Sequence, residues 1–148
     1  MKNIRNIWKD TYPNESNQDE NVPLAILERQ AKAINEDKAK TDIIATVISI
    51  TNSTELAKIK HILYLLPVHG NNYNYRFVEF NQPIGSYYPV TISAYQQGET
   101  SFGECYKEDE IYDALEKIYK DKRRSIVFEQ LKNIGETVKA WNQEKDEI

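Results

Sequence analysis

The spacing of apolar residues changes twice along the chain, from a helical period to a strand period and back again. Near the start, apolar residues recur at intervals of three and four, at Leu24, Leu27, Ala31 and Ile34. This spacing places them on one face of a helix. Pro23 fits the first turn of that helix, because an N–H at this position would have no partner within the helix. The pattern predicts a helix that begins near residue 21 and packs against a core.

The middle of the chain is rich in β-branched and aromatic residues, which favour strands. The segments expected to form strands are 41–51, 58–68, 74–80 and 87–95, with a shorter fifth candidate over 101–106. In the first segment, apolar residues occupy both alternating sets of positions, which is typical of a strand buried on both faces, although the pattern alone does not distinguish it from a buried helical turn. Short polar links join the segments, so neighbouring strands are expected to be antiparallel, because a parallel pair needs a long crossover.

The C-terminal third returns to the helical period in two stretches. Ile111, Leu115 and Ile118 form one apolar stripe, and a second stripe runs from Val127 to Trp141. The basic run 120–124 is expected to connect the two helices, with Ser125 as the cap of the second.

The predicted fold class is therefore α+β: an antiparallel meander sheet of four to five strands, with one helix before it and two helices after it. A single domain over residues 21–148 is expected to follow an N-terminal arm or linker over residues 1–20, where the sequence is mostly polar and aperiodic.

Composition narrows the classes of function. The chain has 148 residues, enough for one domain with a sizeable core, and its net charge of −4 makes nucleic acid an unlikely partner. The one cysteine, Cys105, cannot form an intramolecular disulfide and favours a reducing compartment. No apolar run suggests a signal peptide or a membrane span, so the sequence predicts an acidic, cytoplasmic protein that does not enter a membrane.

The residues that most often carry chemistry have simpler structural explanations here. His69 precedes Gly70 in a polar segment typical of a hairpin connection, and no partner that could orient its ring is evident from the sequence. His61 lies in a strand among apolar residues, and it is not spaced with His69 as zinc ligands on a helix would be. Acidic neighbours of Cys105 disfavour a thiolate. The sequence therefore predicts no catalytic residue, no metal site and no cofactor.

Tyrosine is the most informative residue type, with ten copies in the chain. Tyrosine combines a large rigid ring with a hydroxyl group, which suits surfaces that become buried in complexes as well as ordinary sheet faces. In the third strand, Tyr73, Tyr75 and Phe77 are expected on one face, with Arg76 and Val78 on the other. The candidate residues for binding a partner or ligand are His69, Tyr73, Tyr75, Arg76, Tyr88 and Tyr95.

The leading hypothesis is a non-enzymatic module that binds another protein, alone or as a homodimer. Tyrosines and Arg76 would be the anchors, and an acidic rim would attract a basic partner. Secretion chaperones and immunity proteins are similar in size and charge only, which is an analogy. The alternative is a small-molecule-binding domain or an enzyme, with a pocket between sheet and helices near His69, Tyr73 and Tyr75. A nucleic-acid contact through the basic run 120–124 is the weakest hypothesis.

Overall fold

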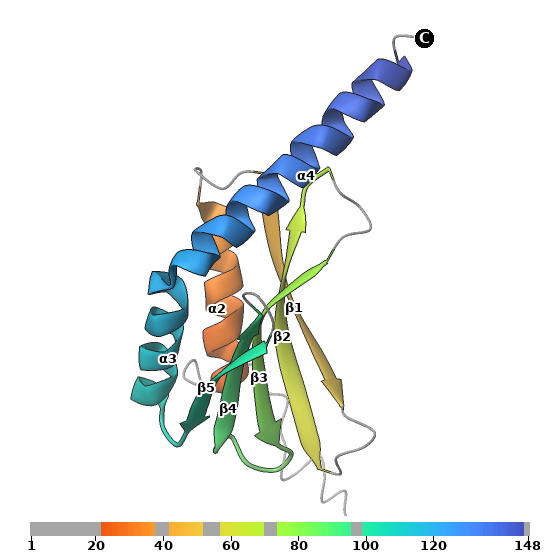
Figure 1. Cartoon of the computed structure of the whole chain (residues 1–148). Coiled ribbons are helices and arrows are strands. Elements are labelled where there is room, and N and C mark those ends of the chain that lie inside the picture. The colour runs from red at the N-terminus through yellow and green to blue at the C-terminus, as the bar shows by residue number, and fades with distance from the viewer. Residues whose placement is uncertain (1–21, 38–41, 52–56, 70–73, 96–98, 147–148) are drawn as a thin grey trace, which may run out of the picture.

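The computed structural model describes residues 22–37, 42–51, 57–69, 74–95 and 99–146. Within these residues, one helix is followed by five strands and then by two helices (Figure 1), which confirms the predicted α+β meander. The elements are α2 (Pro23–Glu36), β1 (Ile43–Thr51), β2 (Lys58–Pro67), β3 (Tyr75–Pro83), β4 (Val90–Tyr95), β5 (Glu99–Cys105), α3 (Glu108–Lys120) and α4 (Lys122–Asp146).

The five strands form one sheet in their order along the chain, and every neighbouring pair is antiparallel. This is the arrangement that short polar connections favour, because a hairpin link can join only antiparallel neighbours. The strands β1 and β5 are the two edges. In β5 the pairing with β4 shifts by one residue, and Gly103 lies at the shift with a φ of +89°. This backbone conformation, which glycine adopts without steric cost, marks a β-bulge in the edge strand.

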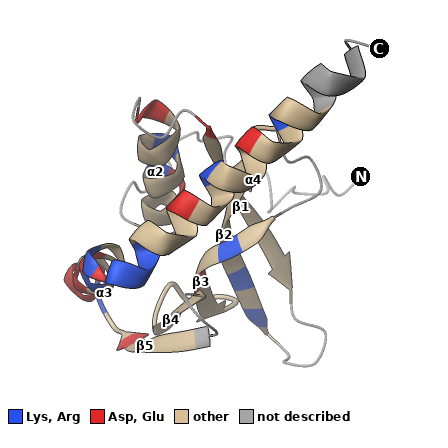
Figure 2. Ribbon diagram, turned by 45° about the horizontal axis from the view of Figure 1, so that its top comes forward, with Lys and Arg blue, Asp and Glu red and all other residues tan. Residues whose placement is uncertain are grey.

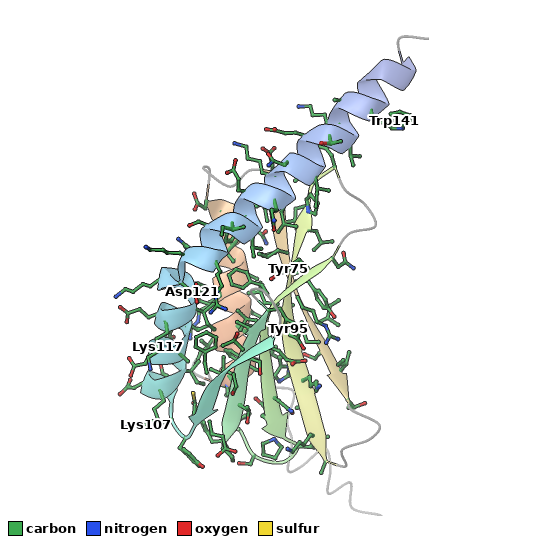
Figure 3. The ribbon with its side chains drawn as sticks, in the orientation of Figure 1. Tyr75, Tyr95, Lys107, Lys117, Asp121 and Trp141 are labelled. Carbon is green, nitrogen blue, oxygen red and sulfur yellow. The ribbon has the colours of Figure 1, made fainter. Side chains whose placement is uncertain are left out.

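All three helices contribute buried residues to one core against a single face of the sheet (Figure 1). The helices contribute Ile26, Leu27, Ala31, Ile111, Ala114, Leu115, Ile118, Val127, Phe128 and Leu131. The C-terminal part of α4 projects beyond the sheet, and Figure 3 shows Trp141 there, with 58% of its surface exposed. Where α4 crosses the end of β2, the helix packs closely against Pro67 at the buried Gly135.

The third strand differs from its expected alternation. Leu63 of β2 pairs with Val78, whereas the next residue, Tyr64, pairs with Arg76. Phe77 is therefore an extra residue in β3, and both Phe77 and Val78 lie in the core with 1% of their surface exposed. The prediction that Val78 shares the face of Arg76 is wrong, because this bulge turns two successive side chains toward the helices.

The first strand was expected to be buried on both faces, and the structure corrects this. Ile43 and Ala45 are buried against the helices, but Ile44, Ile48 and Ile50 on the opposite face keep 46, 45 and 40% of their surface exposed. A sequence pattern reports which positions are apolar, not what covers them. Within the described part of the chain, β1 is thus an edge strand with one uncovered apolar face.

The connection between α3 and α4 is shorter than the sequence suggested. Only Asp121 separates the two helices, so most of the basic run lies inside α4. The Asp121 carboxylate accepts a hydrogen bond from the Arg123 backbone N–H at 2.9 Å, and the Arg123 guanidinium donates to it as well, at 2.6 Å. Asp121 caps α4, because its carboxylate satisfies a free N–H group of the first turn. Ser125, the cap expected from the sequence, lies inside the helix instead.

We expect the stability of the fold to depend on the charge of Asp121. Hydrogen bonds from the Arg123 side chain and backbone lower the pKa of Asp121 to about 2 from its usual 3.8. The ionised group therefore stabilises the fold above pH 3.8, and this stabilisation is lost as the pH falls to about 2. In urea unfolding at neutral pH, Asp121→Asn should be less stable than wild type, and Asp121→Ala less stable still. An Asn variant whose deficit persists unchanged at the lowest pH would contradict this.

Candidate functional site

The structure distributes the predicted site residues over both faces of the sheet. Arg76 and Tyr95 lie on the face away from the helices, whereas Tyr75 and Tyr88 pack against the core. His69 is half-buried in the turn after β2. Tyr73 lies outside the described residues. Figure 3 shows Tyr75 beside α4 and Tyr95 further along the sheet. Of the six, the structure brings together Arg76 and Tyr95.

Arg76 is held by aromatic side chains from two neighbouring strands. Its Nε donates a hydrogen bond to the Tyr64 hydroxyl of β2 at 3.4 Å. Its guanidinium carbon lies 5.9 Å from the centre of the Tyr95 ring of β4, within reach of a cation–π interaction. The hydrogen bond with Tyr64 is the main cause that raises the pKa of Arg76 above its usual value. Arg76 is thus a fixed positive charge whose orientation is set before any partner arrives.

A buried carboxylate lies next to this arginine. Glu79 has 4% of its surface exposed, and its Oε1 lies 3.7 Å from Lys60 Nζ and 3.9 Å from Arg76 Nη1. Two cations around one carboxylate leave the group with a net charge of about +1. Figure 2 shows basic positions on the middle strands, whereas the helices carry both acidic and basic positions and β5 carries an acidic one. The acidic rim that the sequence suggested around Arg76 stays a prediction, and the strand register places Glu104 of β5 on the same face of the sheet.

The surface around Arg76 combines fixed polar groups with exposed apolar ones. We call it the open sheet face and define it by Ile44, Ile48, Ile50, Tyr64, Arg76 and Tyr95. Sequence reasoning missed the contribution of Lys60 and Glu79. Their positions follow from strand register, since Ile62 pairs with Glu79 and Lys60 with Asn81. The sequence did show that Lys60 and Tyr64 alternate with Leu63 along the strand. Alternate residues point to opposite faces, so these two side chains were expected to point away from the core.

His61 forms a polar pair on the opposite, helix-covered face. The residue keeps 4% of its surface exposed, and its Nδ1 lies 2.6 Å from the hydroxyl oxygen of Ser49, the residue directly across on β1. Burial lowers the pKa of His61 from its usual 6.5, which favours the neutral ring. In the tautomer with its proton on Nε2, Nδ1 accepts a hydrogen bond from the Ser49 hydroxyl, and among the described residues no carboxylate is hydrogen-bonded to the ring. The pair lacks the third group that orients the base in a nucleophilic triad.

We expect His61 to make the fold less stable in acid. Because its folded-state pKa lies below 6.5, the unfolded chain binds more protons, and stability falls as the pH drops below that value. The urea midpoint of the wild type should therefore decrease between about pH 8 and pH 5, and that of His61→Gln should decrease less. His69→Gln is the matched control and should behave as wild type. An equal decrease in all three proteins would contradict the assignment.

A hollow of about 610 Å³ opens beside His61, between the start of α2 and the connection from β3 to β4. Its lining is mainly apolar and includes Leu24, Ile59 and Ile84. Gln82 also lines it, is 7% exposed, and has a buried Oε1 without a hydrogen-bond partner. A second hollow of about 410 Å³ lies between Tyr75 and α4. Either of these hollows could hold a small molecule on the helix-covered side.

The thiol and the acidic groups do not assemble into a reactive centre. Burial raises the pKa of Cys105, and the nearby Glu110 and Asp113 raise it further, so the thiolate is disfavoured. Among the described residues, no three His, Cys, Asp or Glu side chains come together as a metal ion would require. None of the helices in the described part of the chain combines the length and the apolar character needed to cross a membrane.

Comparisons with protein-family models, with curated proteins and with solved structures gave no match.

Proposed function

We propose that this protein is a non-enzymatic interaction module that binds another protein through the open sheet face. The observation that carries this proposal is a sheet face that lies away from α2, α3 and α4 and that carries exposed isoleucines on β1 and a preorganised arginine on β3. A binding surface typically combines apolar contact area with aromatic residues and arginine as anchors. Here Arg76 is oriented by Tyr64 and Tyr95, so little side-chain entropy remains to be lost on binding.

The charge of this surface suggests the chemistry of the partner. Within the cluster around Arg76, the two cations of Lys60 and Arg76 lie near the one carboxylate of Glu79, although the whole chain carries a net charge of −4 and Glu104 of β5 lies on the same face of the sheet. A partner segment with apolar side chains and a carboxylate would complement this local positive charge. The partially exposed guanidinium, with 40% of its side chain accessible, can reach such a carboxylate. The buried, lone Cys105 supports a reducing, cytoplasmic setting.

Affinity capture from the native host, followed by binding measurements with each purified prey, tests the proposal. Arg76→Ala and Tyr95→Ala should each weaken binding of the true partner by about tenfold or more, because anchors at protein interfaces contribute about 1–2 kcal/mol or more. Tyr112→Ala is the matched control, since Tyr112 is an exposed tyrosine on α3, in the helix layer. Equal affinities for all four proteins, wild type included, would exclude the open sheet face as the binding site.

A second candidate function, small-molecule binding, is supported by the hollow beside His61. Its volume of about 610 Å³ is in the range of ligand sites, and Gln82 offers an unpaired acceptor in an apolar surround. A ligand with an apolar body and one donor group would suit it. Ala25 also lines the hollow, and Ala25→Trp should fill it. Fragments that raise the melting temperature of the wild type but not of this variant would support the second candidate.

A further inference from the structure

The backbone of β1 shows which of its peptide groups face outward from the sheet. The side-chain amide of Asn35 in α2 donates to the Ala45 carbonyl at 2.9 Å and accepts from the Ala45 N–H at 2.7 Å. This is the pattern that a neighbouring strand would make. Since Ala45 bonds to α2, its backbone groups point away from β2. Asn35 therefore closes the outer edge of β1 at this one residue.

The remaining outward groups follow from the alternation of an antiparallel ladder. Backbone groups of every second residue point to the same side, so Val47, Ser49 and Thr51 face outward together with Ala45. Within the described residues, no strand lies beyond β1. The strand also lacks charged residues, proline and glycine, the usual devices that protect an edge from pairing. The outward backbone N–H and C=O groups between Val47 and Thr51 are thus positioned to bond to another strand.

We propose that this edge pairs with the β1 strand of a second copy of the chain, antiparallel and centred on Ser49, to form one continuous sheet. In this register Val47 of one copy exchanges hydrogen bonds with Thr51 of the other, and the two Ser49 residues face each other. All three outward residues of each copy are then bonded. A register centred one residue earlier would place Thr51 against Ala45, whose groups Asn35 already occupies.

The side chains favour a second copy as the occupant. In the register centred on Ser49, Ile48 of each copy lies beside Ile50 of the other on the open sheet face. Four isoleucines that are 40–45% exposed in the single chain would then cover one another. No like charges meet, because the strand has none. This pairing also explains why β1 has apolar residues at both parities although the helices cover only one of its faces.

Analytical ultracentrifugation of the full chain, at micromolar and at sub-millimolar concentration, tests the proposal. The wild type should sediment with twice the mass of one chain at the higher concentration. Ile48→Lys should weaken the dimer by about tenfold or more, because a lysine would be desolvated against Ile50 of the other copy. Ile126→Lys, at a 50% exposed isoleucine in α4, is the matched control and should leave the dimer intact.

The double variant Ile48→Lys/Ile50→Glu tests the register. Each lysine would face a glutamate of the other copy, so the double variant should dimerise more strongly than Ile48→Lys alone. Circular dichroism and the urea midpoint of each variant, measured at low concentration, show whether the single chain remains folded. A wild type that stays monomeric at the higher concentration overturns the proposal, and so does a folded Ile48→Lys that stays fully dimeric. Failure of the double variant to recover would overturn the register.

The two proposals can fail separately. Arg76→Ala should leave the sedimented mass unchanged, because Arg76 lies on β3, away from the β1 edge. A monomeric wild type that still loses its protein partner through Arg76→Ala would overturn the dimer and support the interaction module. If a foreign extended peptide, rather than a second copy of the chain, protects the β1 backbone amides from hydrogen exchange, the proposed pairing between two copies is wrong.

Discussion

Replacing Phe77 by alanine is expected to lower the free energy of unfolding by about 3–5 kcal/mol. Phe77 is 1% exposed. Its ring meets Tyr119 of α3 and Phe128 of α4 edge to face, with ring centroids 6.4 and 5.7 Å apart. These contacts join the sheet to both C-terminal helices, so the smaller side chain would leave a cavity where three elements meet. Urea unfolding followed by circular dichroism measures the change.

Two variants show whether the effect comes from this position in the core. Phe77→Leu keeps most of the apolar volume and should cost about 1–2 kcal/mol. Phe102→Ala removes a half-buried ring from the edge strand β5 and should cost less than Phe77→Ala. A loss below about 1 kcal/mol for Phe77→Ala would mean that the bulge does not anchor the helices as described.

Replacing Glu79 by alanine is expected to cost about 1–3 kcal/mol, because it leaves two cations beside each other without their carboxylate. Glu79 is 4% exposed, whereas the Lys60 and Arg76 side chains keep 25 and 40% of their surface accessible. Water can still reach both cations, which places the expected cost below that of breaking a fully buried ion pair. The free energy of unfolding from urea titration is the measurement.

A double-mutant cycle separates the interaction from the loss of the side chain itself. Lys60→Met keeps most of the apolar stem of the lysine and removes its charge. If Glu79 is stabilised by Lys60, the double variant should be more stable than the sum of the two single effects predicts, by about 0.5–1 kcal/mol. Additive effects would show that the 3.7 Å approach of Lys60 to Glu79 contributes nothing measurable.

The sequence predicted the order of the elements because that order follows from local information. Short polar links allow only antiparallel neighbours, and the stripe of Ile111, Leu115 and Ile118 becomes the buried face of α3. The bulge at Phe77 was not predicted, although the alternation of polar and apolar residues in the segment 74–80 shifts at the successive apolar residues Phe77 and Val78. Bulges are determined by how neighbouring strands pair across the sheet.

The candidate site was predictable only in part, for two physical reasons. Arg76 and Tyr95 were identified as single residues, but their contact depends on the register of two different hairpins. Glu79 was missed because its burial depends on Lys60 and Arg76 closing around it. The sequence showed that Ile44, Ile48 and Ile50 make one face of β1 apolar. It could not show what covers that face, because the same pattern of apolar residues results whether helices or a second molecule lie against it.

In the proposed pairing of two copies through β1, the bulge at Gly103 limits how large the assembly can become. A strand that is kinked and carries an exposed glutamate, Glu104, beside the kink is a poor template for an incoming strand. Growth into a fibre requires two compatible edges on each molecule, whereas an isologous contact uses the same edge twice and closes on itself. Because β1 is the edge that pairs and β5 is an edge that disfavours pairing, the addition of further copies ends at a dimer.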